Sequence, residues 1–298
     1  MVLPVNDGTS TILHTLQWGI RKLINSGLDN PRLDAEVLLA HTLSLDRVAL
    51  YRNPEGLLAS DVIERYAALL ERRVKREPVA YITGYKEFWS LNFTITHDVL
   101  IPRPETEILL EEVLKACAFL TSKKDHLRLL ELGTGSGILA VSIAKEVPGC
   151  SIFATDISTK KIDVARNNAR LHRVDTATTF LVGDLYHPIT TREEKDKFDC
   201  IVFNPPYLSH DDWKNAQPEI QDYEPIDSLW GGHDGLAFYR SLIPGVHILL
   251  RRGGYLILEI GRGQAENIKA LIRRTTVYRT VDVVQDCAGI ERVICART

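Results

Sequence analysis

The residues best suited to chemistry are Asn204-Pro205-Pro206-Tyr207, which follow an apolar run from Phe198 to Phe203. Such a run is typical of a buried strand, and the prolines end it because neither can donate to a sheet ladder. Asn204 is therefore expected at the carboxyl end of a strand, where open α/β sheets bind ligands. Its amide and the flat ring of Tyr207 suit a planar substrate with an NH2 group, either an amide or a base with an exocyclic amine. An ordinary turn at the end of a strand can also contain these residues.

A second candidate site is a glycine-rich turn between an expected strand at 127–132 and an expected helix at 138–147. Its candidate binding residues are Glu131, Gly133, Thr134, Gly135, Ser136 and Gly137. Glycines at every second position let the backbone turn tightly and approach a ligand closely. The dinucleotide fingerprint needs its last glycine one position later, where this chain has Ile138. A pyrophosphate is therefore not favoured, and a purely structural turn stays open.

Acidic residues follow the next two expected strands, at 151–155 and 178–182. Asp156, followed by Ile157, can accept hydrogen bonds from both hydroxyls of a ribose. Asp184 can accept from an adenine amino group, and Leu185 can pack on the ring. Each acid alone can equally be a turn cap. Their recurrence beside the glycine turn points to a nucleoside without phosphates, S-adenosylmethionine.

The elements that must position these residues alternate between strand and helix from Leu127 onward, as in an α/β fold. The later expected elements are helices at 158–172, 236–250 and 263–274, a strand at 254–260, and an antiparallel end at 277–284 and 292–296. Before them, residues 1–85 predict a helical domain, with helices opened by Ser10, Asn30 and Ser60. This domain either recognises a substrate or only braces the fold. Residues 86–102 alternate in polarity and predict a β-hairpin connector to a catalytic domain at 103–298.

Composition narrows the function classes. The 298 residues suffice for two domains, and 45% hydrophobic with 25% charged residues is typical of a soluble globular protein. A net charge of −3 argues against nucleic-acid binding that is independent of sequence. Five dispersed cysteines, no signal peptide and no membrane span predict a reduced, cytoplasmic protein. The histidines and cysteines show no metal-ligand spacing, so no metal is expected.

Two further segments have uncertain roles. Arg103 lies between two prolines, so its place is well defined; it can bind substrate, or it can be an exposed arginine at the start of a helix. Residues 208–235 hold seven acids against one lysine, a net charge of −7 + 1 = −6. The acids are Asp211, Asp212, Glu219, Asp222, Glu224, Asp227 and Asp234. This segment would repel a phosphate backbone and favour a basic or neutral peptide, or it is simply a solvated loop.

The segment Gly133–Tyr207 resembles class I S-adenosylmethionine-dependent methyltransferases with an Asn-Pro-Pro-Tyr motif. Nearly the whole chain resembles one family, the release factor glutamine methyltransferases. The matching segments are Arg32-Leu33-Asp34-Ala35-Glu36, Glu77–Gly84, Phe88-Trp89-Ser90, Leu100–Glu107, Tyr223-Glu224-Pro225, Gly231–Leu236 and Glu291-Arg292-Val293. One departure is Leu185, where some relatives have an aromatic residue; leucine should still pack against adenine.

This resemblance implies a Rossmann-like sheet of seven mostly parallel strands with helices on both faces, in which the first and fourth strands are neighbours. It implies catalytic roles for Asn204, Pro205 and Tyr207, and substrate contacts from these residues, Pro206 and Arg103. The cofactor would contact Asn204 together with the glycine turn, Asp156, Ile157, Asp184 and Leu185.

The implied activity is methylation of the side-chain nitrogen (N5) of the glutamine in the Gly-Gly-Gln motif of class I peptide chain release factors, by a monomer that binds neither nucleic acid nor membrane. The alternatives are a ribosomal protein glutamine, an exocyclic amine in DNA or RNA, and a non-catalytic binding module.

Overall fold

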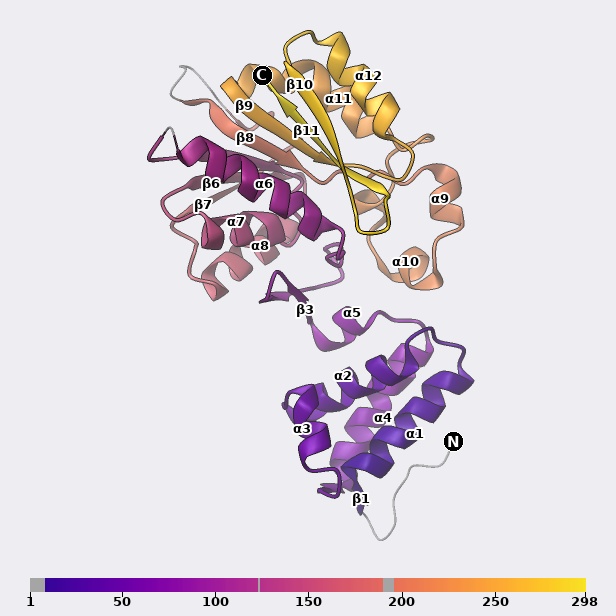
Figure 1. Cartoon of the computed structure of the whole chain (residues 1–298). Coiled ribbons are helices and arrows are strands. Elements are labelled where there is room, and N and C mark those ends of the chain that lie inside the picture. The colour runs from indigo at the N-terminus through magenta and orange to yellow at the C-terminus, as the bar shows by residue number, and fades with distance from the viewer. Residues whose placement is uncertain (1–8, 123, 190–195) are drawn as a thin grey trace. The chain divides into compact units, whose positions relative to one another are not determined.

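A computed structural model describes residues 9–122, 124–189 and 196–298 (Figure 1). The chain forms two compact units. The helical unit consists of Met1–Gly84 together with Pro218–Tyr223, and the catalytic unit consists of Tyr85–Gln217 and Glu224–Thr298. A short segment that follows the Asn-Pro-Pro-Tyr motif therefore packs with the N-terminal helices.

The helical unit buries one core between its main helices. Its elements are β1 (Thr9–Thr11), α1 (Ile12–Asn25), α2 (Pro31–Leu43), α3 (Arg47–Arg52), β2 (Leu57–Ala59), α4 (Ser60–Val74), α5 (Val79–Thr83) and α10 (Pro218–Tyr223). Tyr66 of α4 is fully buried, and its hydroxyl donates to the Ala35 carbonyl at 3.1 Å. A side chain at Gly19 would lie 2.1 Å from that hydroxyl, so α1 needs glycine where Tyr66 approaches it.

The first helix begins one residue later than the sequence indicated. Ser10 lies in β1, and Thr11 is the N-cap, because its hydroxyl accepts from the amide of His14 at 3.1 Å. Both residues are good caps, so the pairing of β1 with β2 decides between them. This two-stranded sheet and the short helix α3 were not predicted.

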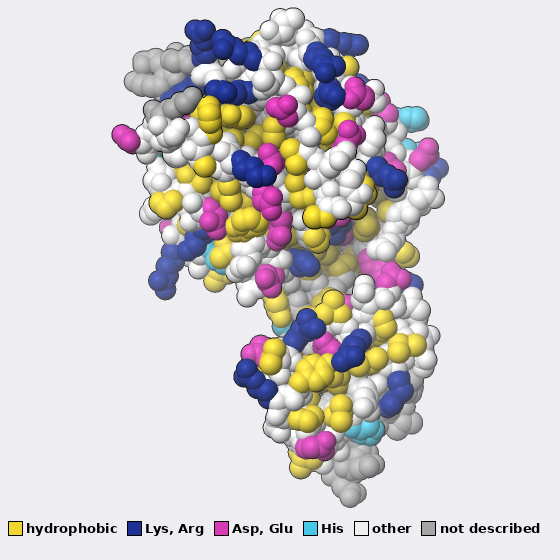
Figure 2. All heavy atoms as spheres, viewed as in Figure 1, with side chains coloured by type: hydrophobic (Ala, Val, Ile, Leu, Met, Phe, Trp, Pro, Cys, Tyr) yellow, Lys and Arg dark blue, Asp and Glu magenta, His cyan; other side chains and the backbone are white. Residues whose placement is uncertain are grey.

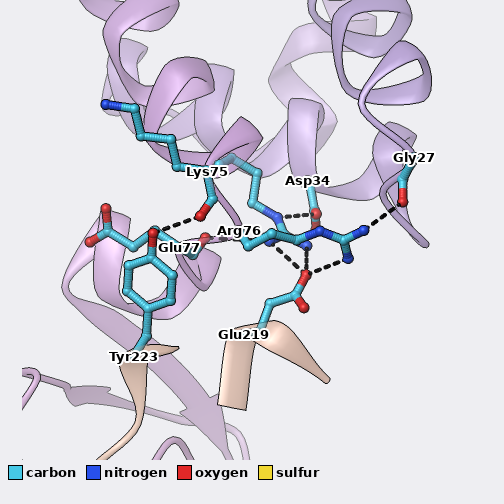
Figure 3. A network of polar contacts seen from close by, with 8 residues as sticks. Gly27, Asp34, Lys75, Arg76, Glu77, Glu219 and Tyr223 are labelled. Atoms are coloured by element: carbon cyan, nitrogen blue, oxygen red, sulfur yellow. Dashed lines mark hydrogen bonds and ion pairs between the residues drawn. The ribbon is translucent and has the colours of Figure 1, made fainter. Parts of the chain in front are cut away.

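Helix α10 joins the helical unit through an ion-pair network (Figure 3). The Glu219 carboxylate accepts from Arg73 at 3.0 Å and from Arg76 at 3.2 Å, and Arg73 also donates to Asp34 at 2.7 Å. The Tyr223 hydroxyl donates to the Lys75 carbonyl at 2.6 Å. The basic end of α4 is thus the docking site of α10.

The catalytic unit is built on a seven-stranded sheet with the order β10-β11-β9-β8-β5-β6-β7. Its strands are β5 (Arg128–Leu132), β6 (Ser151–Asp156), β7 (Thr178–Val182), β8 (Phe198–Phe203), β9 (Leu250–Glu259), β10 (Thr280–Gln285) and β11 (Glu291–Arg297). Strands β5 to β9 run parallel, and β11 is antiparallel to both of its neighbours. The first and fourth strands, β5 and β8, pair side by side, which confirms the predicted fold class.

Helices cover both faces of this sheet. On one face lie α6 (Thr106–Thr121), α7 (Ile138–Glu146) and α8 (Thr159–Leu171); on the other lie α11 (Ala237–Val246) and α12 (Ala265–Arg274) (Figure 1). The short helices α9 (His210–Lys214) and η2 (Ile226–Ser228) lie in the connection between β8 and α11, and η3 (His247–Leu249) leads into β9. Both faces of the parallel strands are covered, so β8 is buried along its whole length.

The predicted hairpin is present as β3 (Tyr85–Phe88) and β4 (Leu91–Thr94). It is attached to the catalytic unit through Asn168 of α8, which is fully buried. The side chain of Asn168 exchanges hydrogen bonds with the backbone of Thr94 at 2.8 and 3.1 Å, and donates to the Ser136 carbonyl at 2.8 Å. One side chain therefore links the hairpin to the glycine turn. Among the described residues, no helix is both long and apolar enough to cross a membrane.

Candidate active site

A cavity of about 290 Å³ lies at the carboxyl ends of β5, β6, β7 and β8. This is the edge where parallel α/β sheets bind ligands. The predicted residues that line it are Arg103, Glu131, Gly133, Thr134, Gly135, Ser136, Asp156, Ile157, Asp184, Leu185, Asn204 and Pro206. Three predicted residues, Gly137, Pro205 and Tyr207, are not in the lining. The fold thus brings the glycine turn, both acids and Asn204 to one cavity.

The glycine turn is held open toward the cavity by its backbone conformation. Gly133 and Gly135 have φ of 62° and 54°, in the left-handed region that favours glycine. A side chain at Gly133 would lie 3.2 Å from the ring of Phe203, so the turn and β8 approach closely. Gly137 is needed for helix packing instead, because a side chain there would press against Ala165 of α8, at 3.0 Å. This glycine therefore permits the packing of α7 on α8.

Asp156 fixes the turn from the neighbouring strand. Its carboxylate accepts from the amide of Gly135 at 3.0 Å and from the amide of Ser158 at 3.0 Å, and the side chain is buried. Each carboxylate oxygen has a second lone pair free to accept from a ligand. The sequence suggested either a ligand contact or a turn cap for this acid, and the geometry allows both at once.

Leu185 enters the cavity in a strained conformation. Its φ is 44°, in the region that residues other than glycine rarely adopt. The hydroxyl of Thr155 donates to its carbonyl at 2.7 Å and holds it there. Backbone strain of this kind, of order 1–3 kcal/mol, persists where the surroundings fix it, often at ligand sites.

Glu131 is a buried acid beneath the glycine turn. It accepts from the hydroxyl of Thr134 at 2.7 Å and from the amide of Ala140 at 3.0 Å. Burial raises the pKa of Glu131 to about 8, and these two hydrogen bonds only partly oppose the rise. The carboxyl is thus largely protonated at neutral pH, and it organises the turn without adding a full negative charge.

The Asn-Pro-Pro-Tyr segment is held from two sides. On one side, the Asn204 amide nitrogen donates to the hydroxyl of Thr106 at 3.3 Å. On the other, the Tyr207 carbonyl accepts from the Gln264 side chain at 2.9 Å. A side chain at Gly231 would lie 2.6 Å from the Pro206 carbonyl oxygen, so the glycine-rich segment 231–235 can lie directly against this backbone.

Tyr207 is a neutral hydrogen-bonding and packing group. Burial raises its pKa further above the ordinary value for a phenol, and the nearby acid Glu259 adds to the rise. A phenol with so high a pKa does not act as a base at neutral pH. Tyr207 is therefore suited to packing and hydrogen bonding, and the substrate contacts of Tyr207 and Asn204 stay predictions.

Arg103 lines the cavity and forms an ion pair with the buried Glu224, at 2.5 Å. Glu224 also accepts from the amide of Ile101 at 3.2 Å, so it holds the segment before α6 in place. Two segments singled out in the sequence, 100–107 and 223–225, therefore meet. The structure gives Arg103 this partner, and a substrate contact stays a prediction.

The acidic segment 208–235 carries much less free charge than its sequence suggests. Four of its seven acids have basic partners, in the pairs Glu219–Arg73, Glu224–Arg103, Asp227–Lys161 and Asp234–Arg240. A fifth, Asp212, forms a capping box with Ser209 at the start of α9. The expected value of −6 counted acids without the cations that fold against them.

Several residues of the site were not predicted, namely Thr106, Lys161, Gln264 and Glu259. Lys161 of α8 is buried; its ammonium donates to Asp227 at 2.9 Å and to Ser228 at 2.7 Å, and all three residues line the cavity. Glu259 was recognisable in principle, because it ends a strand as Asp156 does. Nothing in the local sequence distinguishes Lys161 from the exposed Lys160 beside it.

Fold and site together define a class I methyltransferase. The strand order, the glycine turn at the end of β5, Asp156 at the end of β6 and the Asn-Pro-Pro-Tyr segment after β8 are its parts. Solved structures agree on the fold alone. The human METTL16 catalytic domain with MAT2A 3′UTR hairpin 6 is 14% identical, with a TM-score of 0.56 over 81% of this chain and 84% of that one. A methyltransferase from Pyrococcus furiosus is 18% identical, with a TM-score of 0.51 over 78% and 98%.

Sequence relatives are more specific. Residues 14–84 match the PrmC N-terminal domain, and residues 105–220 match the methyltransferase small domain. Release factor glutamine methyltransferase of Thermodesulfovibrio yellowstonii is 40% identical over 92% of this chain and 95% of its own length. The Coxiella burnetii protein of the same name is 41% identical over 90% and 92%. The chain belongs to the release factor glutamine methyltransferase family, and it is an S-adenosylmethionine-dependent methyltransferase.

Proposed function

We propose that this enzyme methylates the side-chain amide nitrogen of the glutamine in the Gly-Gly-Gln motif of class I peptide chain release factors. The observation that carries the proposal is the orientation of Asn204. Its nitrogen donates to Thr106, so its oxygen is left to accept from a substrate NH2 group at the cavity. The relatives named above, at about 40% identity over nearly the whole chain, support release factors as the substrate.

The cavity fits S-adenosylmethionine by the chemistry of its lining. Gly133 and Gly135 form a cradle that side chains would fill or distort, Asp156 can accept from ribose hydroxyls, and Asp184 and Leu185 can receive the adenine. When bound, the cofactor supplies an electrophilic methyl group on a positively charged sulfur. The two cations in the lining, Arg103 and Lys161, are each paired with a carboxylate, which limits their repulsion of that charge.

The residues of the chain would act mainly by orientation. An amide nitrogen is a poor nucleophile, because its lone pair is delocalised into the carbonyl. Asn204 Oδ1 and the Pro205 carbonyl would accept the two N–H groups and direct the lone pair toward the methyl group, while Pro206 and Tyr207 pack on the amide plane. Such positioning supplies most of the rate enhancement. The nitrogen loses a proton readily once it carries the methyl group, so no strong base is required.

Substrate selection would rest on protein contacts. The segment 208–235 leaves Asp211 and Asp212 exposed at α9, which favours a basic or neutral peptide over a phosphate backbone. On the face of the catalytic unit seen in Figure 2, basic and acidic side chains are interspersed. We further propose that Arg103 contacts the substrate, that residues 1–85 help to recognise it, and that the enzyme is a cytoplasmic monomer that does not bind nucleic acid.

The proposal is tested by methyl transfer from labelled S-adenosylmethionine to a purified release factor, beside a Gln→Ala version of its Gly-Gly-Gln motif. Label is expected on the first protein alone. Asn204→Ala should lower turnover by about 10³-fold or more and leave cofactor affinity largely intact. The exposed Asn215→Ala is the matched control and should behave as wild type. Equal labelling of both release factors, or near wild-type turnover by Asn204→Ala, would contradict the proposal.

A further inference from the structure

The side-chain amide of Asn204 can lie in either of two orientations, and the residue type alone does not select between them. The two ends of an Asn amide are almost the same in shape, yet only the oxygen can accept from a substrate NH2 group. If the amide turned over, its own NH2 would face the substrate and repel it. Something in the site must therefore distinguish nitrogen from oxygen. In the structure, the nitrogen of Asn204 points to the hydroxyl of Thr106, at 3.3 Å.

A hydroxyl alone does not select between the two ends, because it can either donate or accept. Its choice depends on its other neighbour. Thr106 begins helix α6 and is 1% exposed, and the carboxyl of Glu259 lies beside it. Glu259 ends β9, the strand next to the one that leads into Asn204, and is also 1% exposed. An ionised carboxylate can only accept, so the single proton of Thr106 is drawn to Glu259. The lone pairs of Thr106 then face Asn204 and can receive only an NH2 group.

We propose that Glu259 and Thr106 are positioning residues that fix the direction of the Asn204 amide, so that its oxygen faces the methyl acceptor. This inference rests on the proposed role of Asn204 in binding an NH2-bearing substrate. Tyr207 also lies beside the Glu259 carboxyl and helps to lower its pKa, so the same acid can influence both the first and the last residue of the Asn-Pro-Pro-Tyr motif.

The surroundings of Glu259 keep it in place and make it sensitive to pH. Its main-chain carbonyl accepts from the Tyr239 hydroxyl of α11 at 2.7 Å, and its Oε2 has no hydrogen-bond partner among the described residues. The charged groups that face it are Glu105, just before α6, and Arg292 of β11. Burial raises the pKa of Glu259 to about 7; Glu105 adds to the rise, while the hydrogen bonds from Thr106 and Tyr207 and the charge of Arg292 oppose it.

The ionised form is the one that selects the orientation of Asn204. A protonated Glu259 no longer requires the proton of Thr106, so the orientation is lost as the pH falls. Turnover by the wild type should therefore decline below pH about 7. Glu259→Gln cannot ionise, and its amide can present either end to Thr106. Its turnover should be several-fold lower at pH 8 and should lack the decline centred near pH 7.

The decisive variants are Thr106→Val, which keeps the shape and removes the hydroxyl, and Thr106→Ser, which keeps the hydroxyl. Thr106→Val should lower kcat by about 10- to 100-fold, the usual cost of a misplaced catalytic group, with cofactor affinity within two-fold of wild type. Thr106→Ser should restore kcat to within a few-fold. A wild-type kcat in Thr106→Val, equal losses in both variants, or a parallel loss of cofactor affinity would overturn the proposal.

A second measurement keeps this test separate from the identity of the substrate. In ¹⁵N-labelled enzyme without substrate, the side-chain NH2 signal of Asn204 is assigned by its disappearance in Asn204→Ala. One of its hydrogens should exchange slowly with water in the wild type and in Thr106→Ser, and rapidly in Thr106→Val and Glu259→Leu. Slow exchange in all variants would overturn the proposal that Glu259 and Thr106 orient the Asn204 amide, even if release factors are methylated. If the exchange rates follow the expected pattern but no release factor is methylated, the roles of Glu259 and Thr106 stand and only the proposed substrate is overturned.

Discussion

Two glutamates, one in each unit, have almost no exposed surface, yet their pKa values shift in opposite directions. Glu36 of the helical unit is 3% exposed, and Glu131 of the catalytic unit is 2% exposed. Burial raises the pKa of both, but the net pKa of Glu36 is lowered whereas that of Glu131 rises to about 8. Two causes act together: the Glu131 carboxyl lies deeper in the protein and so loses more hydration, and the two glutamates have different partners. Glu36 accepts from Tyr51, Arg47 and Arg32, while Glu131 accepts from one hydroxyl and one backbone amide.

The same contrast holds elsewhere in the two units. Glu219 pairs with Arg73 and Arg76, and its pKa is lowered despite burial. The hydroxyls of Thr106 and Tyr207 lie beside the Glu259 carboxyl, and burial raises its pKa to about 7. Charge pairs in the helical unit hold short helices together. In the catalytic unit, the buried acids Glu131 and Glu259 lack such a close ion pair, although Glu224 is paired with Arg103 and Asp199 with Lys124 and Arg251. The stability of the helical unit should therefore fall when a cation is removed, and the stability of the catalytic unit should depend on pH.

The largest expected effect is the pH dependence caused by Glu131. Its folded pKa is higher than the usual 4.5, so the folded state binds more protons than the unfolded state between pH 4.5 and 8. The stability contributed by the neutral carboxyl is present below pH 4.5 and is lost as the pH rises toward 8. At 1.36 kcal/mol per unit, the loss amounts to up to about 5 kcal/mol.

Urea unfolding without cofactor, at pH 5 and pH 8, measures this loss. Glu131→Gln is the test variant, because it keeps the shape and does not titrate. The decrease in the free energy of unfolding from pH 5 to pH 8 should be larger in the wild type than in Glu131→Gln. If the free energy of unfolding decreases equally in both proteins, the pKa of Glu131 is not raised by folding, and the proposed contrast with Glu36 is wrong.

The next effect concerns Arg73, whose guanidinium joins Asp34 and Glu219. Arg73→Met leaves two nearly buried carboxylates without this partner, and should lower the free energy of unfolding by about 3 kcal/mol, as for other broken buried pairs. The matched control is Arg65→Met on the same helix, where the exposed pair with Asp61 at 3.6 Å should contribute less than about 0.5 kcal/mol. Equal losses in the two variants, measured by urea titration at pH 7, would show that burial of the pair does not matter.

The smallest effect concerns the one buried lysine among the cavity-lining residues. Lys161→Met removes the hydrogen bonds that the ammonium donates to Asp227 and Ser228. It should weaken binding of S-adenosylmethionine by about ten-fold, or about 1.4 kcal/mol. Lys160→Met is the control, because the side chain of Lys160, next to Lys161 in the sequence, is 78% exposed and pairs with Asp98 at the surface. Calorimetric titration of each variant with cofactor measures the difference. Equal affinities would mean that the segment 226–228 stays in place without Lys161.

Much of the site was predictable from short stretches of sequence. The apolar run before Asn204 became β8 over the predicted residues, because its neighbours on both faces are apolar. The glycine turn, Asp156 and Asp184 line one cavity, because parallel strands end at one edge of a sheet. These features are local: a strand, the turn after it and the first polar residue beyond.

The sequence by itself determined the class of fold, the family and most of the residues around the cavity, because alternating apolar segments and glycine turns act over a few residues. Only the tertiary structure decided which charges are neutralised and which way polar groups point. Glu219 and Arg73 are 146 positions apart, and Thr106 and Asn204 are 98 apart. Such pairs depend on where distant elements pack, and the partners that they bring together help to set the direction of a pKa shift.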